Sequence, residues 1–221
     1  MPAAYHYHFR RADPAMHGVI KRVGPYTLKP NRDRFGMLVR SIISQQISVS
    51  AARAIRGRLE TLVGDEGLQP QKLASLSIDQ LRSVGLSPQK ASYMHDLAAK
   101  VADGTVRMAR IGRLDDEAVI GELTQVKGIG RWTAQMFLIF ALGREDVFPI
   151  DDFGVRAAMC RLYGLAEAPP KATLLEIGQR WSPFASIGSW YCWRYLDVLK
   201  AEKANTDVKV KKQKPSSDYP V

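Results

Sequence analysis

The chain has 221 residues, of which 46% are hydrophobic and 24% are charged, a composition typical of a folded globular protein. Lys and Arg outnumber Asp and Glu by 32 to 22, so the formal net charge at pH 7 is +10. The stretch 203–221 holds five Lys and two Asp and accounts for only three of these charges. Because the excess lies mainly in the folded part, a polyanion is the expected partner, with nucleic acid the first candidate and an anionic membrane surface the second.

The composition also excludes several classes of protein. Two cysteines, Cys160 and Cys192, are too few for a disulfide framework or a four-thiolate metal site. The N-terminus lacks the apolar core of a signal peptide, and no apolar stretch reaches the roughly 18 residues that span a bilayer. We therefore expect a cytoplasmic protein, associated with the nucleoid if bacterial. His6 and His8 have no third ligand within reach, so a mobile N-terminus is a better interpretation than a metal site.

Helical periodicity dominates the sequence and almost nothing is typical of a strand, so the predicted fold is all-α. Ser48, Ser77 and Ser87 are expected N-caps, and glycines are expected to end the helices. In chain order, the expected helices cover about 35–43, 49–62, 78–84, 88–101, 116–126, 132–142 and 153–163, with two more after Pro170 and Pro183. The Lys-, Ser- and Pro-containing stretch 203–221 is expected to be a basic, solvated tail.

A tight hairpin is predicted between two of these helices, in the stretch 123–134, Leu-Thr-Gln-Val-Lys-Gly-Ile-Gly-Arg-Trp-Thr-Ala. Two glycines flank Ile129, which would anchor the turn in the core, while free backbone N–H groups at the next helix start could bind phosphate oxygens. The alternative is an ordinary glycine-rich connection, but the basic charge favours DNA-backbone binding. The residues expected to contact DNA here are Lys127, Gly128, Ile129, Gly130, Arg131 and Thr133.

The hairpin, followed by Asp-Val-Phe-Pro-Ile-Asp-Asp-Phe at 146–153, resembles the helix-hairpin-helix DNA glycosylases, and among them the DNA-3-methyladenine glycosylase II type in a compact form without an N-terminal α/β domain. The resemblance covers about 35–195. It implies a glycosylase domain over 1–202, before the tail at 203–221, built as two helical subdomains around a cleft. One subdomain would be about 35–115, and the other, with the hairpin, about 115–202 plus the N-terminal segment.

The resemblance implies that Asp152 is the catalytic carboxylate. Breaking an N-glycosidic bond builds positive charge on the sugar, which a nearby carboxylate stabilises. It could also orient or deprotonate the attacking water, and the sequence leaves these roles open. Without the resemblance, an aspartate pair at a helix start indicates N-capping, and for Asp151 capping remains our interpretation.

Trp132 occupies the position where bifunctional relatives carry the lysine that forms a Schiff base, so the resemblance implies hydrolysis without strand cleavage. Two cysteines exclude the iron–sulfur cluster of the endonuclease branch, and no cofactor is expected. The resemblance also implies a monovalent cation at the backbone carbonyls of Thr124, Val126 and Ile129.

The base pocket is expected to be lined by Trp132, Met136, Phe153 and Trp193, although each of these could instead be a core residue. Electron-rich rings attract cationic alkylated purines more than neutral bases. The break at Gln45 and Gln46 matches the loop that fills the gap left by an extruded base, the alternative being a polar helix break.

The predicted reaction is hydrolytic excision of alkylated purines from duplex DNA by a monomer, leaving an abasic site. The expected substrates are 3-methyladenine and 7-methylguanine, with ethenoadenine as a further candidate. The alternatives are a glycosylase for uracil or oxidised guanine, a non-enzymatic module that binds damaged DNA, and a membrane-surface protein acting through its basic tail.

Overall fold

The computed structural model describes the backbone of residues 3–213 and the side chains of 3–65 and 67–205. Every regular element in this part of the chain is a helix, which confirms the all-α prediction. The α-helices are α1 (Ala4–Ala12), α2 (Pro14–Val23), α3 (Arg34–Ser44), α4 (Val49–Val63), α5 (Pro70–Ser75), α6 (Ile78–Ser83), α7 (Pro88–Ala102), α8 (Asp116–Leu123), α9 (Arg131–Phe137), α10 (Phe153–Tyr163), α11 (Lys171–Gln179) and α12 (Ala185–Gln213). Two 3₁₀ turns (Gly64–Glu66 and Ile111–Arg113) and a π-helical turn (Leu138–Leu142) complete them. None of the helices within the described residues is long and apolar enough to cross a membrane.

The chain divides into two compact units, Leu28–Val147 and Met1–Thr27 with Phe148–Val221. The sequence placed this boundary near residue 115, with the hairpin in the second subdomain. The structure instead packs the hairpin with the unit 28–147, because α9 contacts α3 as well as α8. Packing of this kind depends on contacts between residues far apart in the chain, which periodicity alone does not show.

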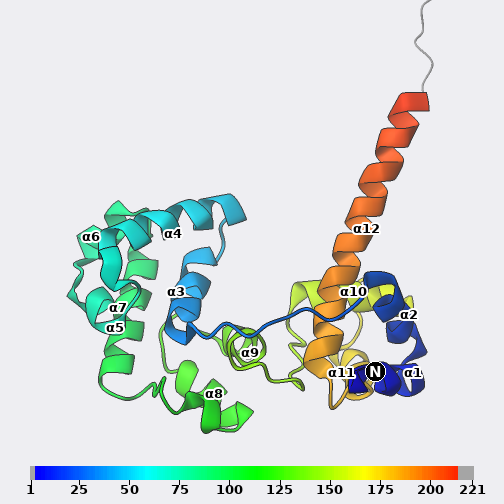
Figure 1. Ribbon diagram of the computed structural model, residues 1–221, viewed down its shortest axis with the longest axis horizontal. Helices are drawn as coiled ribbons and strands as arrows, with labels where there is room; N and C mark the ends of the chain where they lie inside the picture. The colour runs from blue at the N-terminus through cyan, green and yellow to red at the C-terminus, as the bar shows by residue number, and fades with distance from the viewer. Residues whose placement is uncertain (1–2, 214–221) are drawn as a thin grey trace, which may run out of the picture. The chain divides into compact units, whose positions relative to one another are not determined.

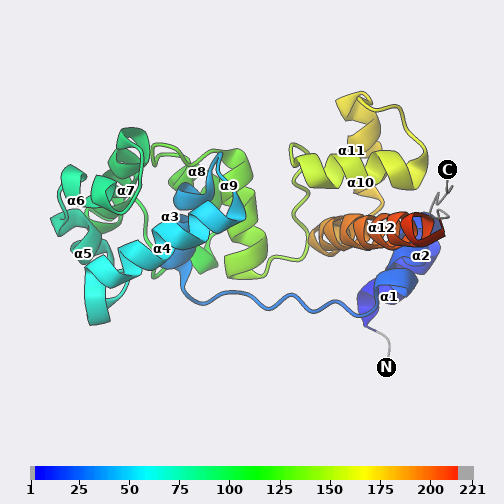
Figure 2. The same ribbon diagram turned by 90° about the horizontal axis from the view of Figure 1, so that it is seen from above.

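The unit 28–147 is organised around α3, which contacts α4, α7 and α9 (Figure 1; Figure 2). Asp33 caps this helix by accepting the Gly36 N–H at 2.9 Å. The apolar face of α3 is buried through Leu38, Val39 and Ile42, at spacings that lie on one side of a helix. The helix ends at Ser44 because Gln45 leaves the helical conformation, with ψ 127°, and the following loop begins there.

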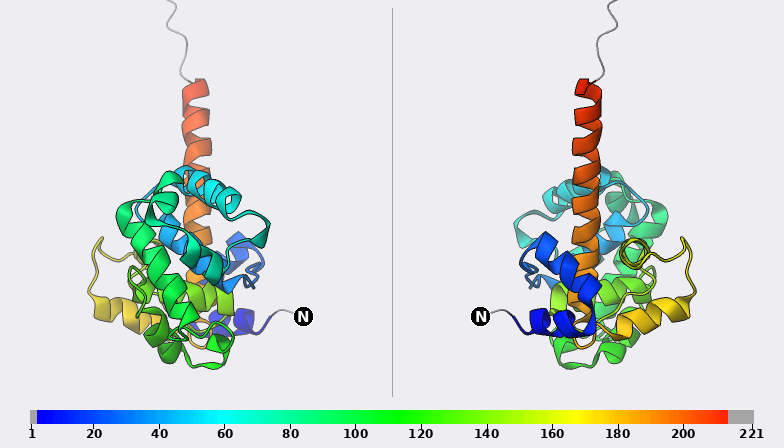
Figure 3. Two further views of the ribbon diagram at one scale, coloured as in Figure 1. Left: turned by 90° about the vertical axis from the view of Figure 1, so that its left-hand side faces the viewer. Right: turned by 90° about the vertical axis from the view of Figure 1, so that its right-hand side faces the viewer.

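In the second unit α12 packs against α2 and α10, and α1 packs against α2 (Figure 1; Figure 3). The buried carboxylate of Asp13 accepts hydrogen bonds from the Met16 N–H at 3.0 Å, the Tyr163 hydroxyl at 2.5 Å and the Trp181 indole N–H at 3.0 Å. Burial and the Asp13 charge raise the pKa of the Tyr163 hydroxyl, which therefore stays a donor. These contacts join N-terminal and C-terminal segments of the chain.

The prediction of a mobile N-terminus is therefore wrong for the described residues, because α1 and α2 bury Phe9 and Met16 completely. His8 hydrogen-bonds the backbone oxygen of Arg180 at 2.8 Å. No cluster of three His, Cys, Asp or Glu able to hold a metal occurs in the part of the chain that the structure describes.

The predicted tail at 203–221 is also wrong in part, because α12 continues as one helix to Gln213. The stretch 203–213 contains neither Gly nor Pro, so no helix-breaking residue ends α12 there. The remainder of the predicted tail, 214–221, lies outside the described residues.

Candidate active site

The hairpin forms as predicted between α8 and α9. Gly128 has φ +79°, a left-handed conformation that favours glycine, and a Cβ at this position would overlap the Tyr93 ring. Ile129 is 3% exposed and anchors the turn in the core. Gly130 is the N-cap of α9 and contributes no side-chain cap bond, so its small size keeps the approach to the helix start uncrowded.

Helix α7 connects this turn to the loop between α3 and α4. The Lys90 ammonium donates to the backbone oxygens of Ile43 at 2.7 Å and Gln45 at 2.6 Å. Two turns further along α7, an Asp96 carboxylate oxygen accepts the Lys127 N–H of the hairpin at 2.7 Å. One helix thus fixes both segments. Sequence analysis missed Lys90, Tyr93 and Asp96; their regular spacing of three was the available signal.

Asp96 is held as a carboxylate. Its burial opposes ionisation, but the Lys127 N–H and the Lys100 ammonium, 2.9 Å away, outweigh burial and lower the pKa of the Asp96 carboxyl below its ordinary value. A charged acceptor makes a stronger hydrogen bond to the hairpin than a neutral one would.

The loop after α3 places Gln46 in an exposed and unusual position. Its φ of +57° makes it the one non-glycine residue with positive φ among those the structure describes. Gln45 is half-buried, and its side-chain amide donates to the Gly128 backbone oxygen at 2.7 Å. The structure therefore distinguishes the two glutamines: Gln45 braces the loop against the hairpin, and Gln46 presents its side chain to solvent.

A cavity of about 470 Å³ in the unit 28–147 is bordered by Trp132, Met136 and both glutamines. The other lining residues are Ser41, Ser44, Tyr93, Gly128 and Thr133. This volume is within the roughly 300–1,000 Å³ typical of ligand pockets. Trp132 is 45% exposed, so it is not a core residue, whereas Met136 is buried at the cavity wall.

Asp152 caps α10 in the other unit and is 8% exposed. One of its oxygens, Oδ1, accepts the Val155 N–H at 2.8 Å and the Trp193 indole N–H at 2.9 Å. Two fixed donors on one oxygen hold the carboxylate plane in a single orientation. The capping role assigned to Asp151 is wrong: that side chain is exposed and pairs with Lys171 at 3.0 Å.

Two neighbours of Asp152 complete this part of the site. Gly154 is a further residue that sequence analysis missed: a Cβ there would press against the Trp193 ring and displace the indole from Asp152. The available signal was the occurrence of a glycine directly after Asp152 and Phe153, in the first turn of the helix. Phe153 is 86% exposed, which excludes the core alternative for this ring. Phe153 and Trp193 thus belong to the unit of Asp152, and Trp132 and Met136 to the unit of the hairpin.

The remaining predicted contacts lie around the hairpin. Thr133 is buried in the first turn of α9, and Arg131 forms an ion pair with Glu117. Of the carbonyls expected to bind a cation, the Val126 oxygen accepts the Ile129 N–H at 3.0 Å. A carbonyl oxygen has a second lone pair, so this bond is compatible with a cation, which stays a prediction.

Comparison with known proteins agrees with this architecture. Residues 39–183 match the model of the HhH-GPD superfamily base excision DNA repair proteins. DNA-3-methyladenine glycosylase 1 of Schizosaccharomyces pombe is 32% identical over 194 residues, which cover 85% of this chain and 84% of that protein. A putative DNA-3-methyladenine glycosylase of Bacillus subtilis is 31% identical over 74% of this chain and 59% of its own length.

Two solved structures extend the comparison. The crystal structure of DNA-3-methyladenine glycosidase from Bacillus halodurans has a TM-score of 0.80 and 34% identity, over 87% of this chain and 89% of that one. The S. pombe 3-methyladenine DNA glycosylase in complex with abasic DNA has a TM-score of 0.77 and 31% identity, over 87% and 96%. With a family match over more than half of its length and these relatives, the chain belongs to the HhH-GPD superfamily of base excision DNA repair proteins.

Proposed function

We propose that the protein is a monofunctional DNA glycosylase that hydrolyses the N-glycosidic bond of alkylated purines in duplex DNA and leaves an abasic site. The observation that carries this proposal is the buried Asp152 carboxylate, oriented by two N–H donors on one oxygen. The names of the relatives support alkylated purines as the substrate class, with 3-methyladenine and 7-methylguanine first and ethenoadenine as a further candidate.

Asp152 acts on the charge that develops during bond cleavage. As the bond to the base breaks, positive charge accumulates on the deoxyribose, and a preorganised carboxylate lowers the energy of that state. Fixed donors from Val155 and Trp193 mean that the carboxylate need not reorient during the reaction. The same group could also direct the attacking water.

The reaction ends at the abasic site because the site offers no amine nucleophile at the position of Trp132. Lys90, whose side chain lies on the same side of α7 as Tyr93, donates to two backbone oxygens and is held away from such a role. Burial lowers the pKa of the Lys90 ammonium, and its two carbonyl acceptors hold the side chain against the loop after α3.

The base-binding cavity is suited to a cationic ring. Trp132 offers an indole face, which attracts cations, and Met136 offers a polarisable sulfur, which packs favourably against aromatic rings. Gln46 would fill the space that the extruded base leaves in the duplex, while the hairpin N–H groups bind flanking phosphates. The protein would act as a monomer in the cytoplasm, without a cofactor other than a monovalent cation at the hairpin.

Base release from methylated duplex DNA tests the proposal. The purified protein is incubated with alkylated DNA and the released bases are identified by chromatography; 3-methyladenine and 7-methylguanine are expected. Strand breaks should appear only after alkali treatment, since no lyase step is proposed. Release of uracil or 8-oxoguanine alone, from a panel of modified duplexes, would overturn the substrate assignment. Tight binding of abasic DNA with no base release would establish the non-enzymatic alternative.

A further inference from the structure

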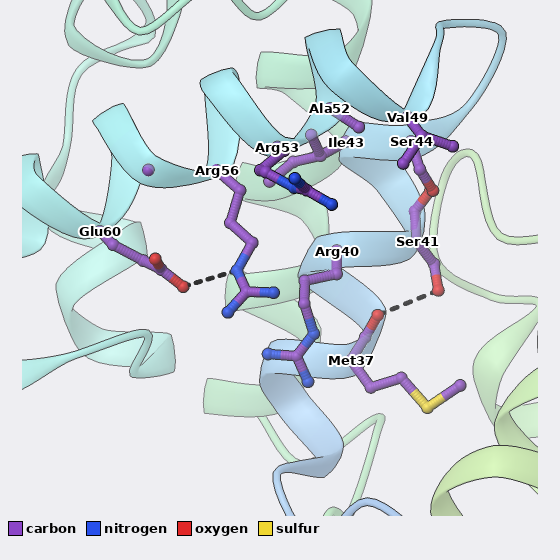
Figure 4. A pocket seen from close by; sticks show the side chains of 11 residues that line it. Met37, Arg40, Ser41, Ile43, Ser44, Val49, Ala52, Arg53, Arg56 and Glu60 are labelled. Atoms are coloured by element: carbon purple, nitrogen blue, oxygen red, sulfur yellow. Dashed lines mark hydrogen bonds and ion pairs between the residues drawn. The ribbon is translucent and has the colours of Figure 1, made fainter.

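Helices α3 and α4 border an open groove of about 630 Å³ with three arginines on its walls (Figure 4). Arg40 comes from α3, and Arg53 and Arg56 come from α4. The spacing of Val49, Arg53 and Arg56 places them on one face of α4. Figure 4 shows the Arg40 and Arg56 side chains extending into the same space between the two helices.

The charges in this groove are incompletely balanced. Arg56 pairs with Glu60 at 2.7 Å, and Arg40 pairs with Asp33 at 2.8 Å. Arg53 makes no ion pair with any residue that the structure describes. Gathering three guanidinium groups raises the local positive potential, and an anion in the groove would relieve their mutual repulsion.

The groove lies next to the loop that carries Gln46. Ser41 and Ser44, near the end of α3, border both this groove and the cavity of Trp132. The C-terminal end of α3 therefore separates the groove from the cavity of Trp132, and the loop of Gln46 follows directly after it. Val49, 78% exposed, forms an apolar rim beside the arginines.

We propose that this groove binds the sugar–phosphate backbone of the DNA strand opposite the damaged base. The inference rests on the proposed function, in which the hairpin and the Trp132 cavity hold the damaged strand. Because Gln46 enters the duplex between the strands, the hollow on the other side of α3 faces the undamaged one. Guanidinium groups bind phosphates, and the apolar Val49 side chain suits a deoxyribose ring. From Val49 to Glu60 α4 rises about 16 Å, enough for several phosphates of one strand.

The first test uses charge variants on a duplex holding a tetrahydrofuran abasic analogue, with binding followed by fluorescence anisotropy. Arg53→Gln combined with Arg56→Gln should weaken binding about 10- to 30-fold at 0.15 M salt and lower the salt slope by about two, as expected for two phosphate contacts. Glu60→Gln should tighten binding by up to about fivefold, because it leaves Arg56 unopposed. A gain of affinity cannot arise from misfolding. The matched control is Arg82→Gln, an exposed arginine paired with Asp79 on α6, which should leave affinity unchanged.

The second test identifies the strand. Neutral methylphosphonate linkages replace three phosphates beside the abasic analogue, either in the damaged strand or in the opposite strand. Neutralising the opposite strand should weaken binding by the wild type more than binding by the double arginine variant, which keeps only Arg40 of the three groove arginines. The inference would be overturned if both proteins lost the same affinity when the opposite strand is neutralised. It would also be overturned if the arginine substitutions changed the effect of neutralising the damaged strand instead.

These outcomes separate the groove from the proposed activity. If the wild type releases alkylated bases but the arginine substitutions do not alter the effect of neutralising the opposite strand, only the assignment of the groove is wrong. Strand-specific coupling without release of alkylated purines would contradict the proposed activity alone, because the binding tests use an abasic analogue.

Discussion

The substitution Asp152→Asn separates the proposed catalytic charge of this residue from its structural role. An asparagine keeps an oxygen that can accept the N–H groups of Val155 and Trp193, and Asn is as good an N-cap as Asp. Each of the two hydrogen bonds loses its charge assistance, about 1 kcal/mol per bond, so the free energy of unfolding should fall by about 2 kcal/mol at most. For a chain of this size that corresponds to about 4–8 °C in Tm.

The effect on the reaction should be larger. Removing one preorganised electrostatic group from a transition state costs about 10²–10³ in rate, or about 3–4 kcal/mol. Single-turnover release of 3-methyladenine, with enzyme in excess over methylated duplex, should therefore slow by at least about 100-fold in Asp152→Asn at a temperature where the variant is folded. The control Asp151→Asn removes an exposed partner of Lys171 and should leave both rate and Tm nearly unchanged. Wild-type rates in Asp152→Asn, or an equal loss in Asp151→Asn, would refute the assignment.

Three further substitutions test the framework. Asp13→Ala removes a buried acceptor of three hydrogen bonds and should lower the free energy of unfolding by about 3 kcal/mol or more, measured by urea titration; a loss below about 1 kcal/mol would contradict the role of this carboxylate. Asp96→Asn should destabilise the protein at pH 7, because the lowered folded-state pKa of this carboxyl contributes stability there. The difference in free energy of unfolding between variant and wild type should shrink as the pH falls below 3.8 and through the folded-state pKa. A difference in free energy that does not depend on pH would count against this explanation. Gly128 has φ +79° and lies beside the Tyr93 ring, so Gly128→Ala should lower the free energy of unfolding by more than about 1 kcal/mol and weaken duplex binding. Gly121 on α8 has open space around it, so the control Gly121→Ala should leave Tm unchanged or raise it in thermal melts.

Local signals in the sequence predicted the hairpin turn and most of the helices from α3 onward, but not α1, α2 or α5. Ser77 and Gln80 form the reciprocal capping box, and Ser48 and Ser87 cap their helices as expected. The burial of Ile129 followed from the two glycines beside it. These features depend on residues within one helical turn of each other, so a sequence pattern contains nearly all the information needed.

Features that depend on distant residues were not predictable in the same way. The first helix buries Tyr5 and Phe9, which share one face at a spacing of four, but its polar sequence does not show that this face packs against the rest of its unit. Asp151 and Asp152 are adjacent and chemically identical, and nothing local shows that Trp193, 41 residues away, selects the second. The contacts of Lys90 with the loop likewise join segments more than 40 residues apart.

The three contacts made by one side of α7 have a mechanical consequence. Lys90 donates to the loop of Gln46, Asp96 accepts the Lys127 N–H of the hairpin, and the Tyr93 ring lies beside Gly128. Since all three side chains project from the one helix α7, the loop of Gln46 and the hairpin are held at a constant separation. If the hairpin binds phosphates and Gln46 enters the duplex, as proposed, α7 would set how far along the DNA these two contacts lie from each other.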